Sequence, residues 1–111
     1  MGRIRYQPPS QPPWPTDSKR EERCRQLAER LEEAREIERR YREAKDEYEN
    51  AWQEKRVACV GGWDKADCIR ARLRFHAAED EFYNVWYERQ YILPSWSIEK
   101  DMKSLKCEEV L

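Results

Sequence analysis

Four cysteines, Cys24, Cys59, Cys68 and Cys107, are the residues of this 111-residue chain best suited to covalent chemistry. Two thiols can join as a disulfide where their Cα atoms come within about 5.5 Å, and an even set favours this chemistry in an oxidising compartment. Buried free thiols are a second interpretation. Zinc is a poor third, because there is no close Cys-x-x-Cys pair and the one histidine, His76, sits away from the Cys59–Cys68 region.

The other reactive side chains do not form a recognisable catalytic pattern. His76 directly follows Phe75, where a surface role is the default. The carboxylates alternate with basic residues at spacings typical of salt-bridged helix surfaces. Gly61 and Gly62 lack the flanking pattern of a phosphate loop and suit a chain reversal instead. We therefore expect no enzyme activity, no cofactor, no metal and no small-molecule substrate.

Composition restricts both the fold and the partners. Charged residues make up 41% of the chain, and apolar residues reach only 39%, so burial must be confined to a narrow seam. The 22 basic residues balance the 23 acidic ones without a basic block, which argues against nucleic acid and against a ribosomal role. No apolar run is long enough to span a membrane, and the start resembles neither a secretory signal nor a transit peptide. Proteins are the expected partners.

The elements that must position the cysteines divide the chain into three parts and predict an all-α fold. Residues 1–17 form a proline-rich extended arm. Residues 18–93 form a long antiparallel hairpin of two helices, 18–59 and 65–93, with a turn at 60–63. Residues 94–111 form a second arm with a short helix. We expect Ser18, Asp64 and Ser97 to cap the three helices, with Glu21 completing a capping box.

Two stripes of apolar and small residues, spaced by threes and fours, predict how the hairpin closes. Such spacing is typical of a coiled-coil seam. Folding back at the glycines brings small residues opposite small ones and aromatic residues opposite aromatic ones. The predicted pairs are Ala51 with Ala71, Tyr48 with Phe75, Ala44 with Ala78, Tyr41 with Phe82, Ile37 with Val85, and Leu31 with Ile92. Arg89 also falls on the stripe. In the C-terminal segment, Ile98, Met102 and Leu105 form an apolar face.

This geometry suggests two cysteine pairs. Cys59 closes the first helix and Cys68 opens the second, directly across the turn. Cys24 lies roughly 52 Å back along the first helix at 1.5 Å per residue, and the chain after Cys68 is long enough to bring Cys107 level with it. Two nested disulfides would staple a two-helix body, whereas the free-thiol interpretation remains open.

Aromatic residues exceed what one narrow seam can bury. The chain has five tryptophans and six tyrosines, and those off the stripes should face partners, because exposed aromatic clusters mark interfaces. The strongest candidate contact surface runs through residues 83–94. The candidate interface residues are Trp14, Trp63, Tyr83, Trp86, Tyr87, Tyr91 and Trp96.

A charged helix leading into Cys59, a glycine-bearing turn, Cys68 opening a second helix and an aromatic-rich continuation resemble the PDSW accessory subunits of mitochondrial respiratory complex I. The resemblance covers residues 42–93, and the chain also looks like coiled-coil–helix–coiled-coil–helix proteins of the intermembrane space. It implies a peripheral subunit on the intermembrane-space side of the inner membrane, imported without a cleaved presequence. It also implies that Cys59 and Cys68 form the hairpin disulfide.

Two functions therefore compete. The first is a non-catalytic accessory subunit that braces a mitochondrial inner-membrane respiratory complex, with the complex I membrane arm as the leading candidate. The second is a cytosolic coiled-coil adaptor with reduced cysteines, which would self-associate through Leu27, Leu31 and Ile37, where the first helix outruns its partner.

Overall fold

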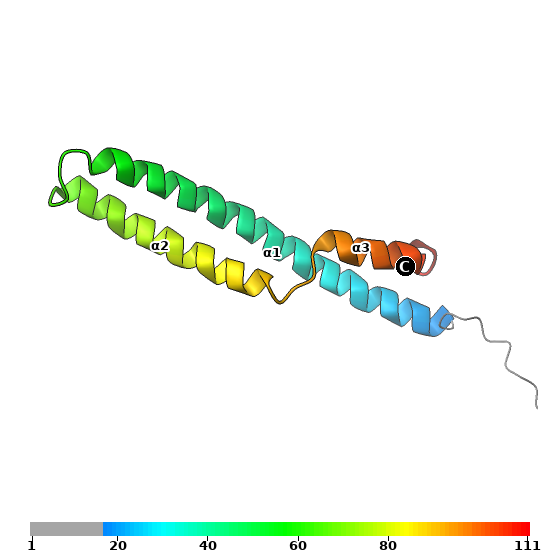
Figure 1. Ribbon diagram of the computed structural model, residues 1–111. Helices are drawn as coiled ribbons and strands as arrows, with labels where there is room; N and C mark the ends of the chain where they lie inside the picture. The colour runs from blue at the N-terminus through cyan, green and yellow to red at the C-terminus, as the bar shows by residue number, and fades with distance from the viewer. Residues whose placement is uncertain (1–16) are drawn as a thin grey trace, which may run out of the picture.

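The computed structural model describes residues 17–111, so most of the predicted proline-rich arm, including Tyr6 and Trp14, lies outside the described residues. Three α-helices and one 3₁₀ helix follow in order: α1 (Asp17–Ala58), α2 (Ala66–Arg89), α3 (Ser95–Ser104) and η1 (Cys107–Glu109) (Figure 1). No strand occurs among residues 17–111. The predicted all-α class is confirmed, and the described part is elongated.

Helix α1 runs through 42 residues because nothing in its sequence interrupts it. Glycine and proline, the strongest helix breakers, are absent from Asp17 to Ala58. Asp17 lies in the first turn and Lys55 and Arg56 in the last, which suits the helix dipole at both ends. At about 1.5 Å per residue the helix is roughly 63 Å long, and it is the longest element among residues 17–111.

Helices α1 and α2 run side by side in opposite directions, with aromatic rings between them (Figure 1). The ring centroids of Tyr41 and Phe82 lie 5.5 Å apart, and Tyr48 lies 5.3 Å from Phe75 and 5.1 Å from Phe82. These distances fall in the range of favourable aromatic pairs. Closer to the open end, Val85 is fully buried in one cluster with Ile37 and Ala44.

Helix α3 covers the part of α1 that α2 does not reach. Figure 1 shows it beyond the end of α2, along the N-terminal half of α1. Ile98, 1% exposed, forms a cluster with Leu27 and Ala34 of α1. The half-buried side chains packed against this cluster are Leu31, Ile92, Met102 and Leu105. The apolar face predicted for the C-terminal segment therefore lies on α1.

The turn between α1 and α2 occupies residues 59–65, longer than the predicted 60–63. The amide of Gly62 donates to the carbonyl of Cys59 at 3.2 Å, which starts the reversal. Gly62 has a φ of +134°, a conformation that side chains with a Cβ rarely adopt. Gly61 has no positive φ, so one glycine of the pair, not both, supplies the special geometry.

All three predicted helix caps were wrong. Helix α1 already includes Asp17, which puts Ser18 inside its first turn. Lys65 rather than Asp64 precedes α2, because the turn continues until the amide of Ile69 bonds to the Lys65 carbonyl at 3.0 Å. Pro94 precedes α3, which places Ser97 inside that helix. No side-chain cap hydrogen bond forms at Lys65 or Pro94.

Helix α2 ends at Arg89, four residues before the predicted end. The amides of Gln90, Tyr91 and Ile92 each bond to a carbonyl three residues earlier, which tightens the chain out of α-helical geometry. Arg89 itself does not enter the seam as an apolar residue would. Its guanidinium lies 4.3 Å from the centre of the Tyr41 ring, a cation–π contact at the edge of the helix pair.

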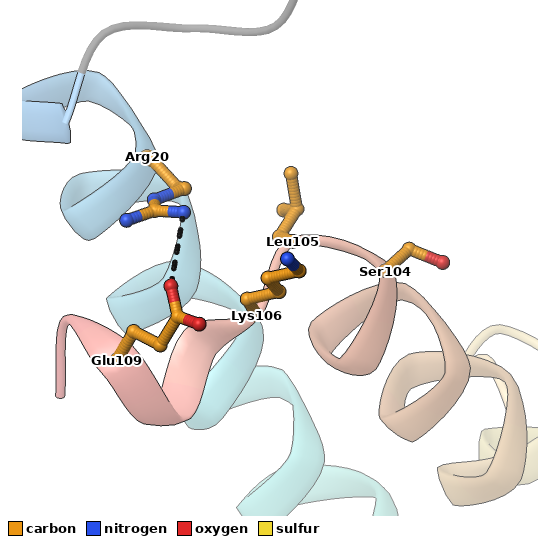
Figure 2. Close-up of a pocket in the computed structure, with 5 residues that line it drawn as sticks. All are labelled: Arg20, Ser104, Leu105, Lys106 and Glu109. Atoms are coloured by element: carbon orange, nitrogen blue, oxygen red, sulfur yellow. Dashed lines mark ion pairs between the residues drawn. The ribbon is translucent and has the colours of Figure 1, made fainter.

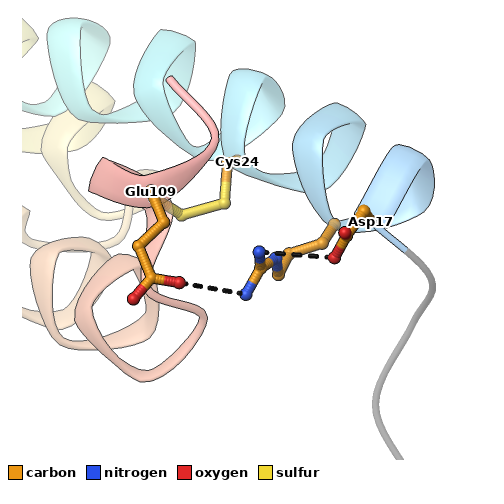
Figure 3. The surroundings of a disulfide bond; sticks show 5 residues. Asp17, Cys24 and Glu109 are labelled. Carbon is orange, nitrogen blue, oxygen red and sulfur yellow. Dashed lines mark ion pairs between the residues drawn. A yellow bond between two sulfur atoms is a disulfide. The ribbon is translucent and has the colours of Figure 1, made fainter. Parts of the chain in front are cut away.

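Both predicted cysteine pairs are disulfides. Cys59 and Cys68, 4.6 Å apart between Cα atoms, close the turn. Cys24 and Cys107, 5.5 Å apart between Cα atoms, tie η1 to α1 near the other end, and the ion pairs of Arg20 with Asp17 and Glu109 lie beside them (Figure 3). The first disulfide lies inside the loop that the second closes, so the two are nested.

Candidate functional site: an exposed aromatic surface at the helix bend

The most exposed large side chains near the candidate contact segment lie where α2 gives way to α3. Tyr91 is 87% exposed, Trp96 67% and Leu93 56%. We call these three residues the bend surface. Monomeric surfaces seldom carry large apolar groups this close together without a binding role. Tyrosine and tryptophan are also the residues that contribute most to protein interfaces.

The backbone beneath the bend surface is fixed from two sides. Ile92, between Tyr91 and Leu93, packs against two core clusters, one around Ile98 and one around Val85. Pro94 then takes an extended conformation and directly precedes α3. Tyr91 and Leu93 flank the half-buried Ile92, so the bend surface is supported by the core.

A carboxylate on α1 holds the start of α3. Glu38 accepts hydrogen bonds from the backbone nitrogen of Ser95 at 2.9 Å and from its Oγ at 2.8 Å. These bonds, the backbone one first, lower the pKa of Glu38 below its ordinary value, with a smaller contribution from the charges of Arg89 and Arg42. The charged form of Glu38 therefore holds the backbone at Ser95, directly before Trp96.

Tyr83, Trp86 and Tyr87 are also exposed, but they lie on α2 rather than at the bend. The Trp86 and Tyr87 rings meet edge to face at a centroid distance of 5.2 Å, and Tyr83 meets the half-buried Phe82 at 5.7 Å. Tyr87 precedes Tyr91 by four residues in the sequence. Five of the seven candidate interface residues thus lie on the C-terminal part of α2, at the bend and at the start of α3.

Trp63 lies apart from them, at the turn that joins α1 to α2. The guanidinium of Arg72 lies 4.4 Å from its ring centre, and Arg72 Nη2 donates to the Trp63 carbonyl at 3.0 Å. Its ring is therefore partly covered by its own chain, although it remains exposed on the other side. Trp14, the seventh candidate, lies outside the described residues.

Sequence reasoning missed several exposed apolar side chains. Leu93 lies within the predicted contact segment 83–94 but was not among the individual interface residues; its position before Pro94 was the available signal, because a pre-proline residue seldom continues a helix. Ile69 and Leu73 are exposed on α2, four residues apart and off the seam. Val57 and Val60 are exposed beside the turn.

A polar hollow of about 290 Å³ lies where η1 meets α1 (Figure 2). Its lining residues are Arg20, Ser104, Leu105, Lys106 and Glu109. Arg20 forms ion pairs with Asp17 at 3.4 Å and with Glu109 at 3.7 Å, so its charge is balanced within the chain. These contacts dock η1 beside the Cys24–Cys107 disulfide, and we assign the hollow a structural role.

The remaining chemistry of the described residues is limited. His76 is exposed, and its nearest charged partner is Glu79, with Nδ1 and Oε1 3.5 Å apart. All four cysteines are oxidised. Within residues 17–111 no group of three or more His, Cys, Asp or Glu side chains is placed to hold a metal ion. None of the helices in that range combines the length and the apolar character needed to cross a membrane.

Comparisons with protein-family models, with curated proteins and with solved structures found no match to this chain. The geometry described above therefore carries the functional argument.

Proposed function

We propose that the chain is a non-catalytic structural subunit that braces neighbouring proteins in a larger assembly. The observation that carries the proposal is the bend surface: Tyr91, Leu93 and Trp96 stand exposed on a backbone fixed by Ile92 and Glu38. A prearranged surface loses little conformational entropy on binding, which favours a stable structural contact.

The two disulfides support an oxidising compartment as the site of action. Disulfides persist where glutathione and thioredoxin do not reduce them. Together with the resemblance to PDSW subunits across residues 42–93, they favour the intermembrane-space side of the mitochondrial inner membrane. We propose the membrane arm of respiratory complex I as the assembly and a peripheral attachment through protein contacts.

The alternative, a cytosolic adaptor that self-associates through Leu27, Leu31 and Ile37, has less support. Leu27 and Leu31 contact α3 of their own chain, and Ile37 contacts Val85. These side chains are therefore occupied within the molecule. Reduced cysteines would also remove the bond that ties η1 to α1.

Fractionation with co-purification tests the proposal. The tagged full chain is expressed in the source cells, mitochondria are separated into compartments, and the associated proteins are identified after mild detergent extraction. We expect the tagged chain in the inner-membrane fraction, released by high pH, and associated with respiratory subunits. Maleimide labelling before and after reduction should detect thiols after reduction only.

A paired set of variants links the association to the bend surface. Replacing Tyr91 and Trp96 by serine should weaken co-purification at least roughly tenfold, because such side chains commonly contribute over 1 kcal/mol each. The control is Val57→Ser, which alters an exposed apolar residue distant in sequence from the bend. Location in the cytosol, or association unchanged in the Tyr91 and Trp96 variant, would count against the proposal.

A further inference from the structure

Helix α2 carries a second stripe with heptad spacing, separate from the seam that packs on α1. Starting at Ile69, its residues follow in steps of four, three, four, three and four. They are Ile69, Leu73, His76, Asp80, Tyr83 and Tyr87. Sustained three-four spacing is typical of a helix face that packs against another helix. We call these six residues the outer stripe.

The outer stripe has no helix against it among the described residues. Every member is exposed, and the apolar and aromatic members range from Ile69 at 42% to Leu73 at 66%. The inward-facing positions Ala71, Phe75, Ala78 and Val85 are buried against α1. Figure 1 shows α1 along one side of α2 and no described segment along the opposite side. Helix α2 therefore has one face that packs on α1 and a second face, the outer stripe, that packs on no described helix.

The outer stripe is complementary to itself in the antiparallel direction. Antiparallel coiled coils place residues reached by a three-residue step opposite those reached by a four-residue step. In the register centred on Ala78, Ile69 then faces Tyr87 of a second copy and Leu73 faces Tyr83. The two polar members face each other, His76 against Asp80. Apolar residues thus meet aromatic ones, and a hydrogen-bond donor meets a carboxylate.

Charge along α2 favours the same arrangement. The half from Ala66 to Ala77 contains three arginines and one aspartate, whereas the half from Ala78 to Arg89 contains four acidic residues and one arginine. Antiparallel pairing sets each basic half against the acidic half of the other copy, and parallel pairing sets like against like. Asp80 forms no ion pair with any residue from 17 to 111, so its charge is free for a partner.

We propose that two copies of this chain pair through their outer stripes, with the two α2 helices antiparallel and His76 of each copy bonded to Asp80 of the other. These two buried polar pairs fix the register of a helix pair that apolar residues alone leave free to slip. The resulting body has four long helices in a row, α1–α2–α2–α1, and two-fold symmetry. This inference goes beyond the proposed function, and either can fail without the other.

Sedimentation of the oxidised full chain across about 1 to 100 µM tests the pairing, because this range spans micromolar dimers. We expect a monomer–dimer equilibrium. Leu73→Arg should weaken it at least roughly tenfold, because two charges would be placed in the apolar layers. Val57→Arg is the matched control, at an exposed apolar site on α1 that lies outside the outer stripe, and it should leave the equilibrium unchanged. Circular dichroism confirms that each variant keeps its helix content.

A charge swap tests the register. His76→Asp places carboxylates opposite carboxylates in both symmetric pairs and should weaken the dimer at least roughly tenfold. Combining it with Asp80→His restores the opposed donor and carboxylate, so the double variant should recover most of the affinity. A strict monomer at about 100 µM overturns the proposal. A dimer that ignores Leu73→Arg, or a double variant no better than His76→Asp, overturns it as well.

Discussion

Glu38 of α1 accepts two hydrogen bonds from Ser95, the first residue of α3, at 2.9 Å from its backbone nitrogen and 2.8 Å from its Oγ. The first amides of a helix have no partner within the helix, and the positive end of its dipole favours a carboxylate. Glu38 therefore does from another helix what a capping side chain normally does from the preceding residue. Glu38 thus connects α1 to the bend and to α3, which lie far from it in the sequence.

Glu38 should make the stability of the molecule pH-dependent. Its pKa is lower in the folded chain than the ordinary value of 4.5, so the contribution is complete above 4.5 and is lost as the pH falls through the folded value. Glu38→Gln should cost about 1 kcal/mol at neutral pH, the scale of a hydrogen bond to a charged group after allowance for partial exposure. Denaturant unfolding of both proteins across the acid range should show the difference shrinking below 4.5.

Glu36→Gln is the control for this experiment. Glu36 bonds to Arg39 within α1, is exposed, and also has a lowered pKa caused first by that hydrogen bond. Its loss should leave the contact between α1 and α3 unchanged. Amide exchange in α3 that is equally fast in both variants would mean that Glu38 does not hold the bend.

The two disulfides should stabilise the chain unequally. In the chain-entropy model, closing a loop lowers the entropy of the unfolded state more when the loop is longer. The Cys24–Cys107 loop spans 83 residues and the Cys59–Cys68 loop nine. Replacing the first pair by serine should cost about 4.5 kcal/mol and replacing the second about 2.5 kcal/mol. Denaturant unfolding of the two double variants measures the difference directly.

The two losses should also differ in location. Without the Cys24–Cys107 bond, α3 and η1 should open first, exposing the cluster around Ile98, whereas the α1–α2 pair retains its aromatic core. Amide exchange resolved by segment checks this. An equal loss from both pairs, or early opening of α2 in the Cys24 variant, would contradict the assignment of α3 as the less stable part.

Phe75→Ala should be the most destabilising single substitution in the aromatic core. Phe75 is 6% exposed, contacts Tyr48 at a centroid distance of 5.3 Å, and lies beneath the Lys55 ammonium at 4.3 Å. Removal of a buried phenylalanine ring costs about 3 to 5 kcal/mol. Val57→Ala, at a site 75% exposed, should cost less than about 0.5 kcal/mol. Thermal unfolding at low protein concentration compares them.

The neighbouring glycines of the turn should respond differently to alanine. Gly62 has a φ of +134°, which strains any residue with a Cβ, so Gly62→Ala should cost at least about 1 kcal/mol. At Gly61 an added Cβ would meet the flexible Lys65 side chain at 3.3 Å, which can move away, so Gly61→Ala should be close to neutral. Similar losses of stability at both sites would exclude φ at Gly62 as the cause.

Two aromatic contacts of the seam and both cysteine pairs were predictable, because residue spacing and chain length largely determine them. Steps of three and four residues placed Tyr48 near Phe75 and Tyr41 near Phe82, and a constant rise per residue brought Cys24 level with Cys107. The aromatic surplus likewise predicted exposed side chains at Tyr91 and Trp96. These inferences depend on periodicity and chain length, which the sequence states directly.

The helix ends were not predictable in the same way, because contacts with distant residues decide them. Capping groups are expected within a few residues of a helix start, and Ser97 met that expectation. The group that binds the start of α3 is instead Glu38, more than fifty residues earlier. The early end of α2 has the same origin, since the chain must leave the helix at Arg89 to bring Ser95 to α1. Leu73 lies off the stripe that packs inside the chain, so the seam pattern did not indicate it.

The nesting of the two disulfides also determines what a protease can do to this molecule. A cut in the turn, at any peptide bond between Cys59 and Cys68, leaves two fragments joined by both disulfides. A cut at the bend leaves two fragments joined by the Cys24–Cys107 disulfide. In both loops that join the helices of residues 17–111, cleavage thus releases no fragment. Until it is reduced, a nicked chain remains one covalent molecule of unchanged mass apart from the added water.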